Sequence, residues 1–373
     1  MLKIIAVDGR LSTVRIRRSP MCRPHMQLRQ LVRLSVALLG LALLVTLLRG
    51  TGPSRVADQL KAVAWGLGLI IVLGGISHLT KTLAWRLTFL CDIRNVSFAR
   101  TFGLRLVSET MGSFGLPGQV LGETARVYLL GSALPVADSV SSVTLDRGLY
   151  ILTSALVSVT GIVAALFLLS LSATWRLYAS LFAGALAVLL VMTAVAFHRR
   201  WPVFSGTARA IGGLPWFKNW LDGKQSVIDS AESNLFTFCQ ENPKAFWASL
   251  TLNLACHGMA ILEVYVLLHF MGARTGLLGA IVVEAFTKLI NVVGALNPGN
   301  FGTYEGGNLL LARLLGIAGP AGLTLGLCRR VRSLFWKAIG LLCLIAMSRS
   351  AQQERRSLQV RYNAVEASSF EMQ

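Results

Sequence analysis

Apolar segments long enough to cross a lipid bilayer recur along the whole chain, and they limit the possible folds more than any other feature. A helix of about 20 apolar residues spans the roughly 30 Å of hydrocarbon in a membrane. The alternating pattern of membrane barrel strands is absent. We therefore predict an all-α polytopic membrane protein. Its long apolar segments are 31–48, 62–84, 147–170, 177–197, 245–271, 277–296 and 321–347, and shorter ones lie near 101–115, 124–136 and 307–318.

The composition agrees with a membrane protein and argues against other classes. Of the 373 residues, 54% are hydrophobic and 14% are charged. The apolar segments leave no room for a soluble domain of about 100 residues. The net charge of +19 comes from Lys and Arg before, between and after these segments. Cytoplasmic loops of membrane proteins collect such residues, so we expect anionic lipid head groups, and not nucleic acid, near them.

The distribution of Lys and Arg also predicts topology and domain limits. The stretches 81–105 and 198–224 are basic, whereas 170–176 and 271–276 each hold a single Arg. Both termini are therefore expected to be cytoplasmic, with no removable signal peptide. The predicted parts are a basic arm at 1–30, a transmembrane domain at 31–348 with halves at about 62–200 and 243–348, an interfacial helix at about 218–240 between them, and a basic tail at 349–373.

The polar segment between the halves has one apolar face. Leu221, Ile228, Ala231, Leu235 and Phe238 follow at helical spacing, yet the segment is too polar to span a membrane. Two interpretations stay open. The helix lies on the cytoplasmic membrane surface, or it is a solvated connector packed on a neighbouring helix.

The two halves contain similar motifs, SFGLPGQVLGETARVYLL at 113–130 and GALNPGNFGTYEGGNLLL at 294–311. Each has an apolar approach, a Pro-Gly step, a further glycine, a glutamate and an apolar continuation. Glu123 precedes Arg147 by 24 positions, and Glu305 precedes Arg329 by the same interval. These matches predict an internal repeat.

Proline and glycine interrupt helices, and irregular backbone inside a membrane survives only where protein or a watery cavity surrounds it. We therefore predict re-entrant or broken helices with tips at Pro117, Gly118, Gly122, Pro298, Gly299 and Gly302. The expected topology makes the two halves pseudo-symmetric and inverted. By analogy, transporters use such repeats to build a central binding site.

Ionisable side chains inside the apolar segments are candidate functional groups, because an unpaired charge in a bilayer costs several kcal/mol. The predicted substrate-binding residues are Glu123, Arg126, Asp146, Arg147, Glu305 and Arg329. Glu123 with Arg147 and Glu305 with Arg329 are the natural ion pairs. Alternatively, Arg126 pairs locally with Glu123, and the glutamates only stabilise helix N-termini. The surplus of basic residues around 326–337 favours an anionic head group, since Arg suits phosphate.

A second polar set consists of Glu109, Glu284, Lys288 and Asn291. The last three share one helix face, which is expected to look into the bundle, although an i,i+4 ion pair is the alternative. His257 and Glu263 are six residues apart, so we interpret His257 as a core histidine and expect no metal site. No GxSxG, HExxH or P-loop motif occurs. We expect neither enzymatic activity nor a cofactor.

Four motifs resemble the membrane domain of lysylphosphatidylglycerol synthases and their stand-alone, flippase-like relatives. They are LPGQVLGETARVYLL at 116–130, SVTLDRGLYIL at 142–152, NPGNFGTYEGG at 297–307 and CRRVRSLFWKAIGLL at 328–342. The resemblance implies a helical domain of the bacterial inner membrane that binds or moves lipids with charged head groups, including polyprenyl-linked or hopanoid-pathway lipids. It carries over Pro117, Gly118, Glu123, Arg126, Asp146, Arg147, Pro298, Gly299 and Glu305. The sequence includes no aminoacyl transferase domain, so lipid lysylation is not expected.

The resulting prediction is an integral membrane protein that binds, and translocates between leaflets, an anionic lipid or lipid-linked intermediate. One alternative is a proton-coupled carrier of a soluble anion that uses Glu284 and Lys288. Another is a non-transporting membrane partner of lipid-synthesis enzymes. The sequence leaves the lipid, the energy source and the oligomeric state open.

Overall fold

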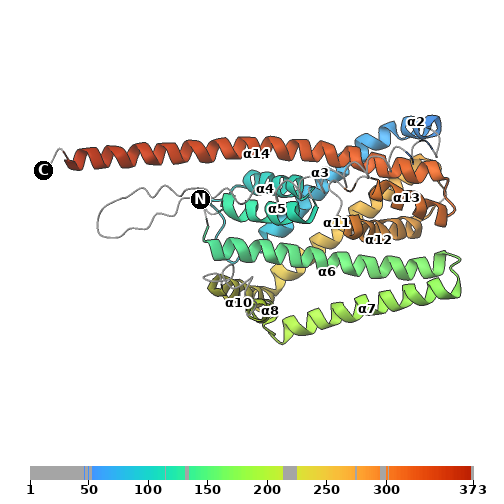
Figure 1. Ribbon diagram of the computed structural model, residues 1–373, viewed down its shortest axis with the longest axis horizontal. Coiled ribbons are helices and arrows are strands. Elements are labelled where there is room, and N and C mark those ends of the chain that lie inside the picture. The colour runs from blue at the N-terminus through green and yellow to red at the C-terminus, as the bar shows by residue number, and fades with distance from the viewer. Residues whose placement is uncertain are drawn as a thin grey trace, which may run out of the picture.

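The computed structural model describes residues 46, 49, 53–113, 115–130, 134–212, 225–273, 275–294, 300 and 302–370, and it describes no side chains beyond residue 349. The predicted apolar segment 31–48 therefore lies almost entirely outside the described residues, as do Leu221, Pro298 and Gly299. Every element in the described part is a helix, which confirms the all-α prediction (Figure 1).

The described helices vary widely in length. They are α2 (Pro53–Ala62), α3 (Ala64–Arg86), α4 (Phe98–Gly112), α5 (Gly115–Leu130), α6 (Val136–Leu168), α7 (Ala173–His198), α8 (Val203–Gly212), α10 (Gln225–Glu241), α11 (Pro243–Phe270), α12 (Leu277–Gly294), α13 (Thr303–Leu314) and α14 (Gly319–Phe370).

Six of these helices are long and apolar enough to cross a membrane, which makes the chain a multi-pass membrane protein. They are α3, α6, α7, α11, α12 and the part of α14 from Gly319 to Arg349. In Figure 1, α6 and α7 run side by side and α14 extends along the opposite side of the molecule.

The first repeat motif follows α4 and forms α5, and both of these helices are short. α4 has 15 residues and α5 has 16, so at 1.5 Å per residue neither is long enough to span roughly 30 Å of hydrocarbon. α4 ends at Gly112 and α5 begins at Gly115, so the two helices separate a few residues before the predicted tip. Pro117 instead lies in the first turn of α5, where a helix tolerates the missing N–H because that group has no intrahelical acceptor.

Gly122 also lies inside α5, so its assignment to a tip is wrong. A Cβ at this position would lie 2.5 Å from the carbonyl oxygen of Ser108 on α4. Glycine is needed there because it lets the two helices approach closely. Gly302 does lie at an interruption of helical structure, since it has a φ of 73° and immediately precedes α13.

The long helices pack on the short pairs from both halves. α14 packs on α4 and α13, α6 packs on α12 and α5, and α3 packs on α11. Small residues allow these contacts. A Cβ on Gly161 of α6 would lie 2.1 Å from the Cβ of Ala285 on α12, and one on Gly340 of α14 would lie 2.5 Å from the Leu106 carbonyl oxygen on α4. Such close approach is typical of membrane helix interfaces.

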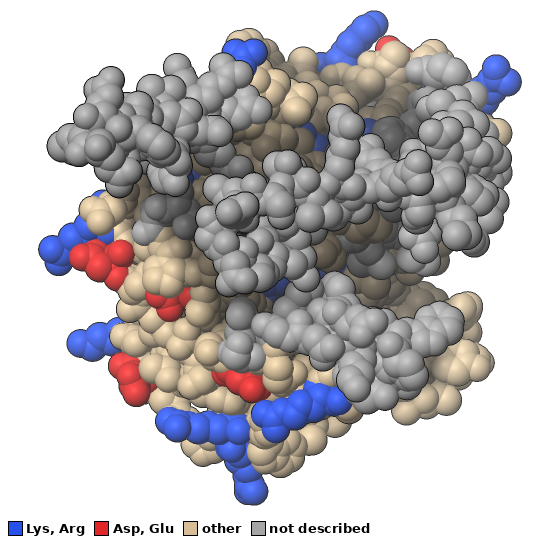
Figure 2. All heavy atoms as spheres, turned by 60° about the vertical axis from the view of Figure 1, so that its left-hand side comes forward, with Lys and Arg blue, Asp and Glu red and all other residues tan. Residues whose placement is uncertain are grey.

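The polar helix between the halves packs against α6. On α10, Ala231, Leu235 and Phe238 are buried, and the last two join a cluster with Leu145 of α6. This contact is the one expected of a connector helix packed on a neighbour. On the side of the molecule where α8 and α10 lie, Lys and Arg side chains project beside carboxylates (Figure 2), and Arg209 pairs with Asp229 between these helices at 3.4 Å.

The cysteines within the described residues are all free thiols: Cys91, Cys239, Cys256, Cys328 and Cys343. Cys239 lies on α10, outside the candidate membrane spans. Burial raises the pKa of its thiol to about 11, so this group stays protonated and unreactive at neutral pH.

Candidate functional site

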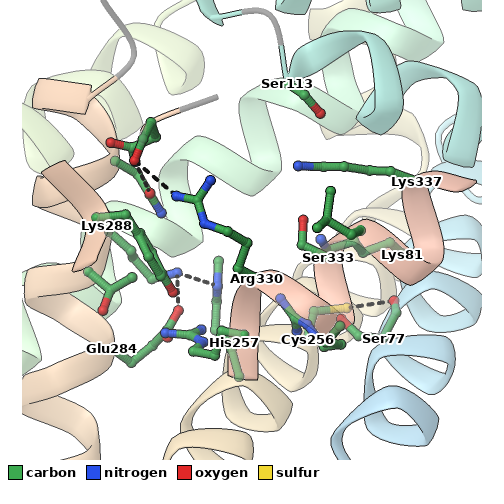
Figure 3. A pocket seen from close by; sticks show the side chains of 18 of the residues that line it. Ser77, Lys81, Ser113, Cys256, His257, Glu284, Lys288, Arg330, Ser333 and Lys337 are labelled. Atoms are coloured by element: carbon green, nitrogen blue, oxygen red, sulfur yellow. Dashed lines mark hydrogen bonds and ion pairs between the residues drawn. The ribbon is translucent and has the colours of Figure 1, made fainter. Parts of the chain in front are cut away.

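A cavity of about 550 Å³ lies among α3, α6, α11, α12 and α14. Its lining is strongly basic, because six cations but only one carboxylate, Glu284, reach its wall. The cations are Lys81, Lys288, Arg329, Arg330, Arg332 and Lys337. Figure 3 shows several of these side chains pointing toward a common space. A basic cavity at membrane depth is costly unless other groups or a ligand balance its charge.

Buried carboxylates balance part of this charge. Arg329 donates from Nη2 to Glu284 at 2.7 Å and lies 3.4 Å from Glu263, which also pairs with Arg332. Lys81 of α3 pairs with Glu109 of α4 at 3.3 Å. These pairs connect α3, α4, α11, α12 and α14 around the cavity. We call the six cations, together with Glu109, Glu263, Glu284 and Glu305, the cavity cluster.

Lys288 lies at the centre of a short series of polar contacts in the cavity wall. Its ammonium is 3.1 Å from Glu284 and donates to Nδ1 of His257 at 2.9 Å (Figure 3). Because Nδ1 accepts, the neutral imidazole carries its proton on Nε2, which donates to Oγ1 of Thr153 at 3.1 Å. His257 is thus a satisfied, buried histidine, and the expected i,i+4 pair of Glu284 and Lys288 is confirmed.

Glu305 has a structural role at the start of α13. It is fully buried, its Oε2 accepts from the backbone N–H of Gly302 at 2.9 Å, and its Oε1 binds Arg330. The first contact caps the helix, as the alternative interpretation of the sequence predicted. The second brings Arg330 across the cavity, where its Nη2 also donates to the Asn300 carbonyl oxygen at 3.1 Å.

A second cavity of about 760 Å³ adjoins the first. The two share six lining residues: Ser113, Tyr150, Lys288, Asn291, Asn300 and Lys337. Away from this junction the second cavity is lined by apolar residues of α6, α7 and α12, namely Ile151, Ala155, Phe182, Leu186, Leu289 and Val292, and by the polar side chains of Gln119, Arg147, Ser154 and Ser158. A basic chamber therefore continues into an apolar groove between membrane-spanning helices.

Arg147 lies at the wall of this groove. Its Nη2 donates to the side-chain oxygen of Gln119 on α5 at 2.8 Å, and its guanidinium lies 5.8 Å from the ring centre of Tyr150. No carboxylate of the described residues pairs with it. The predicted pair of Glu123 with Arg147 is therefore wrong, but the structure places Arg147 where a ligand in the groove would meet it.

The other candidates from the first half form a separate, buried group. Asp146 accepts two hydrogen bonds from Arg105, at 2.7 and 2.9 Å, and one from Arg126 at 2.9 Å. Arg126 also pairs with Glu123 at 3.1 Å, which confirms the local alternative, and it lies 3.7 Å from the ring centre of Trp85. We call Arg105, Glu123, Arg126 and Asp146 the Asp146 cluster. None of its members lines either cavity.

The predicted pair of Glu305 with Arg329 is also wrong, because each residue has a different partner. On α14, Arg330 reaches Glu305, whereas Arg329, one residue earlier, turns toward Glu263 and Glu284. Successive residues on a helix point in directions about 100° apart. The 24-residue interval between Glu and Arg in each half therefore does not correspond to an ion pair in either half.

The set of candidates from the sequence missed Lys81, Tyr150 and Arg105. It also left out Arg330, Arg332 and Lys337, which the sequence marked only as a surplus of basic residues around 326–337. Lys81 and Arg105 are cations within or at the edge of apolar segments, a signal that marks functional or paired groups in membranes. Tyr150 has no charge that would mark it within its apolar segment. Of the second predicted set, Glu284, Lys288 and Asn291 line the first cavity, and Glu109 lines a smaller one beside it with His78 and Trp336.

Comparison with known proteins gave one match. The family model described as the lysylphosphatidylglycerol synthase transmembrane region matches residues 30–340. No curated protein and no solved structure matched the chain. The matched range includes the two cavities, the Asp146 cluster and both repeat motifs. With six helices in its described part that are long and apolar enough to cross a membrane, this chain is an integral membrane protein that belongs to the family of the lysylphosphatidylglycerol synthase transmembrane region.

Proposed function

We propose that the protein binds an anionic membrane lipid and moves it between leaflets. The observation that carries this proposal is the junction of a basic cavity with an apolar groove between α6, α7 and α12. A soluble anion needs only the basic cavity. A lipid needs both, because its head group is charged and its acyl chains are apolar.

The apolar groove is formed by side chains that also face the outside of the bundle. Ile151, Phe182 and Val292 are 55%, 50% and 73% exposed. On a membrane-spanning helix, exposed apolar groups of this kind contact acyl chains at no cost. A lipid can therefore keep its chains among α6, α7 and α12 while its head group lies at Lys288 and Lys337, where the two cavities meet.

Two further parts of the proposal concern architecture. We propose that α3 to α6 and α11 to α14 are the two copies of an inverted repeat, with α4–α5 and α12–α13 as their re-entrant pairs. On this proposal α12 enters the membrane without crossing it, although its 18 residues are long and apolar enough to span. The packing supports this, because α3 contacts α11, and the fourth helix of each copy packs on the second helix of the other. We also propose that both termini face the cytoplasm of a bacterial inner membrane and that the chain has no catalytic activity of its own.

A leaflet-exchange assay tests the proposal. Proteoliposomes containing the purified chain and a fluorescent phosphatidylglycerol are treated with a membrane-impermeant quencher, which bleaches only the outer leaflet. We expect the chain to bring more than half of the probe within reach of the quencher. Bleaching limited to the outer leaflet, as in liposomes without protein, would refute translocation.

Two variants connect this activity to the site. Arg147→Ala removes a cation from the groove wall, and Ala155→Trp fills the groove itself; we expect both to slow exchange at least about tenfold. The matched controls are Arg94→Ala, at an arginine whose side chain is 91% exposed, and Leu181→Trp, on the 61% exposed surface of α7. Equal exchange in the groove variants and their controls would remove the groove from the mechanism.

One observation favours a second candidate function, a proton-coupled carrier of a soluble anion. Lys288 contacts both His257 and Glu284 at the cavity wall, and such a set can exchange a proton with a bound anion. This function predicts uptake of a water-soluble anion into liposomes that follows an imposed pH gradient. A third possibility, a partner of lipid-synthesis enzymes, predicts co-purification of such an enzyme without any flux.

A further inference from the structure

The charges around the first cavity do not balance. The cavity cluster holds six cations and four carboxylates, so it has two positive charges in excess. Each of the four carboxylates is already bound to at least one of these cations. A cavity between apolar helices screens unbalanced charge less than bulk water does, so the excess favours an anionic ligand of matching charge.

Lys337 is the cation of the cavity cluster that is available to bind a ligand. Its ammonium makes no ion pair or hydrogen bond within the described residues, whereas each of the other five cations has a carboxylate partner. Lys337 lines the basic cavity, the apolar groove and the smaller cavity beside Glu109. In Figure 3 its side chain extends from α14 across the cavity toward Ser113. It therefore lies where a head group and its acyl chains would join.

We propose that the ligand carries a phosphomonoester group, which has two negative charges at neutral pH, and that this group binds at Lys337. This inference rests on the proposed function only in assigning the phosphate to a lipid. A phosphodiester carries one negative charge and would leave one positive charge of the cavity cluster unbalanced, in addition to that of Arg147 in the adjoining groove. A head group with an amino acid attached would add an ammonium to a cavity that is already positive.

The phosphomonoester also suits the donors that are present. It offers three acceptor oxygens and loses its second proton near pH 6, so at pH 7.5 it carries close to two charges. Lys337 of α14 and Lys288 of α12 lie at the junction, and Arg330 of α14 lines the basic cavity beside it. Ammonium and guanidinium donors on several sides of one phosphate are the usual arrangement of a strong phosphate site.

The test compares two lipids with the same acyl chains, one that ends in a free phosphate and one whose phosphate is esterified to glycerol. The full chain in nanodiscs is titrated with dioleoyl phosphatidate, a phosphomonoester, and with dioleoyl phosphatidylglycerol, a phosphodiester, and bound lipid is counted by native mass spectrometry. At pH 7.5 we expect phosphatidate to bind at least about tenfold more tightly. At pH 5 the phosphate loses its second charge, so the preference should fall toward equal binding. Equal affinities at pH 7.5 would overturn the proposal.

Substitutions at Lys337 assign the preference to this residue. Because its ammonium has no partner among the described residues, Lys337→Gln should fold normally and lose the preference, and Lys337→Arg should keep it. Lys61→Gln, at a lysine whose side chain is 81% exposed on α2, should change nothing. An unchanged preference in Lys337→Gln, or the same loss in Lys337→Arg, would contradict the proposed contact.

Two more measurements distinguish this inference from binding of free phosphate and from the proposed translocation. If millimolar inorganic phosphate displaced phosphatidate completely, the acyl chains would add no affinity and the lipid assignment would be overturned. Binding of phosphatidate without leaflet exchange would support this inference and refute translocation. Equal exchange of both lipids would support translocation and refute the preference for two charges.

Discussion

The Asp146 cluster and the cavity cluster use the same kinds of ion pair for different purposes. The Asp146 cluster joins two arginines to two carboxylates, so its charges balance, and the indole of Trp85 covers Arg126. The cavity cluster has an excess of two positive charges beside open space. A balanced and closed cluster holds helices together, whereas an unbalanced and open one is suited to a ligand.

The largest expected effect is the loss of Asp146. Asp146→Asn leaves Arg105 and Arg126 buried with only Glu123 as a carboxylate partner, and breaking a buried pair in this way costs about 3 to 5 kcal/mol. We expect a large fall in the fraction of monodisperse protein and in its melting temperature in detergent. A variant that folds normally but no longer binds lipid would place this cluster in the ligand site and break the comparison.

A smaller effect is expected at Trp85. Trp85→Phe keeps an aromatic ring over Arg126 but weakens the cation–π contact, and we expect to lose about 1 to 2 kcal/mol of stability. Thermal unfolding in detergent measures the loss. Lipid binding per folded molecule should not change, because Trp85 lines neither cavity. Altered binding at unchanged stability would contradict a purely structural role.

In the cavity cluster, removal of a carboxylate should act on binding more than on folding. Glu284→Gln leaves Arg329 with Glu263 and raises the excess positive charge beside the cavity. We expect anionic lipid to bind a few-fold more tightly, about 1 kcal/mol or less, with a smaller loss of stability than in Asp146→Asn. Weaker binding of phosphatidate by Glu284→Gln would indicate that the carboxylate positions the ligand-binding cations.

The smallest effect serves as a baseline for these comparisons. Asp92 and Arg94 form an exposed ion pair at 3.6 Å, with side chains 69% and 91% exposed. Exposed pairs contribute little, so Asp92→Asn should leave the stability within about 0.5 kcal/mol of the parent protein. A change as large as that of Trp85→Phe would show that the detergent measurement reports surface charge and not the buried clusters.

The sequence predicted the helical membrane fold because the hydrophobic effect acts on segments of fixed length, and such segments can be recognised without knowing their neighbours. It also predicted the residues near the site, since charges such as Lys288 and Arg329 are conspicuous inside apolar helices. The pairing of these charges was predicted less well. Glu123, Arg147, Glu305 and Arg329 all have partners other than those expected from equal spacing.

By itself, the sequence determined that this chain spans a membrane and that its helices are interrupted near two Pro-Gly motifs. It also determined that basic residues lie within the apolar helices. Only the tertiary structure decided which charges meet. The rotation of α14 sends Arg329 and Arg330 to different carboxylates, and the packing of α6, α7 and α12 leaves the groove that reaches Lys337. Burial depends on the local composition of a segment, whereas ion pairs depend on how helices distant in sequence are rotated against one another.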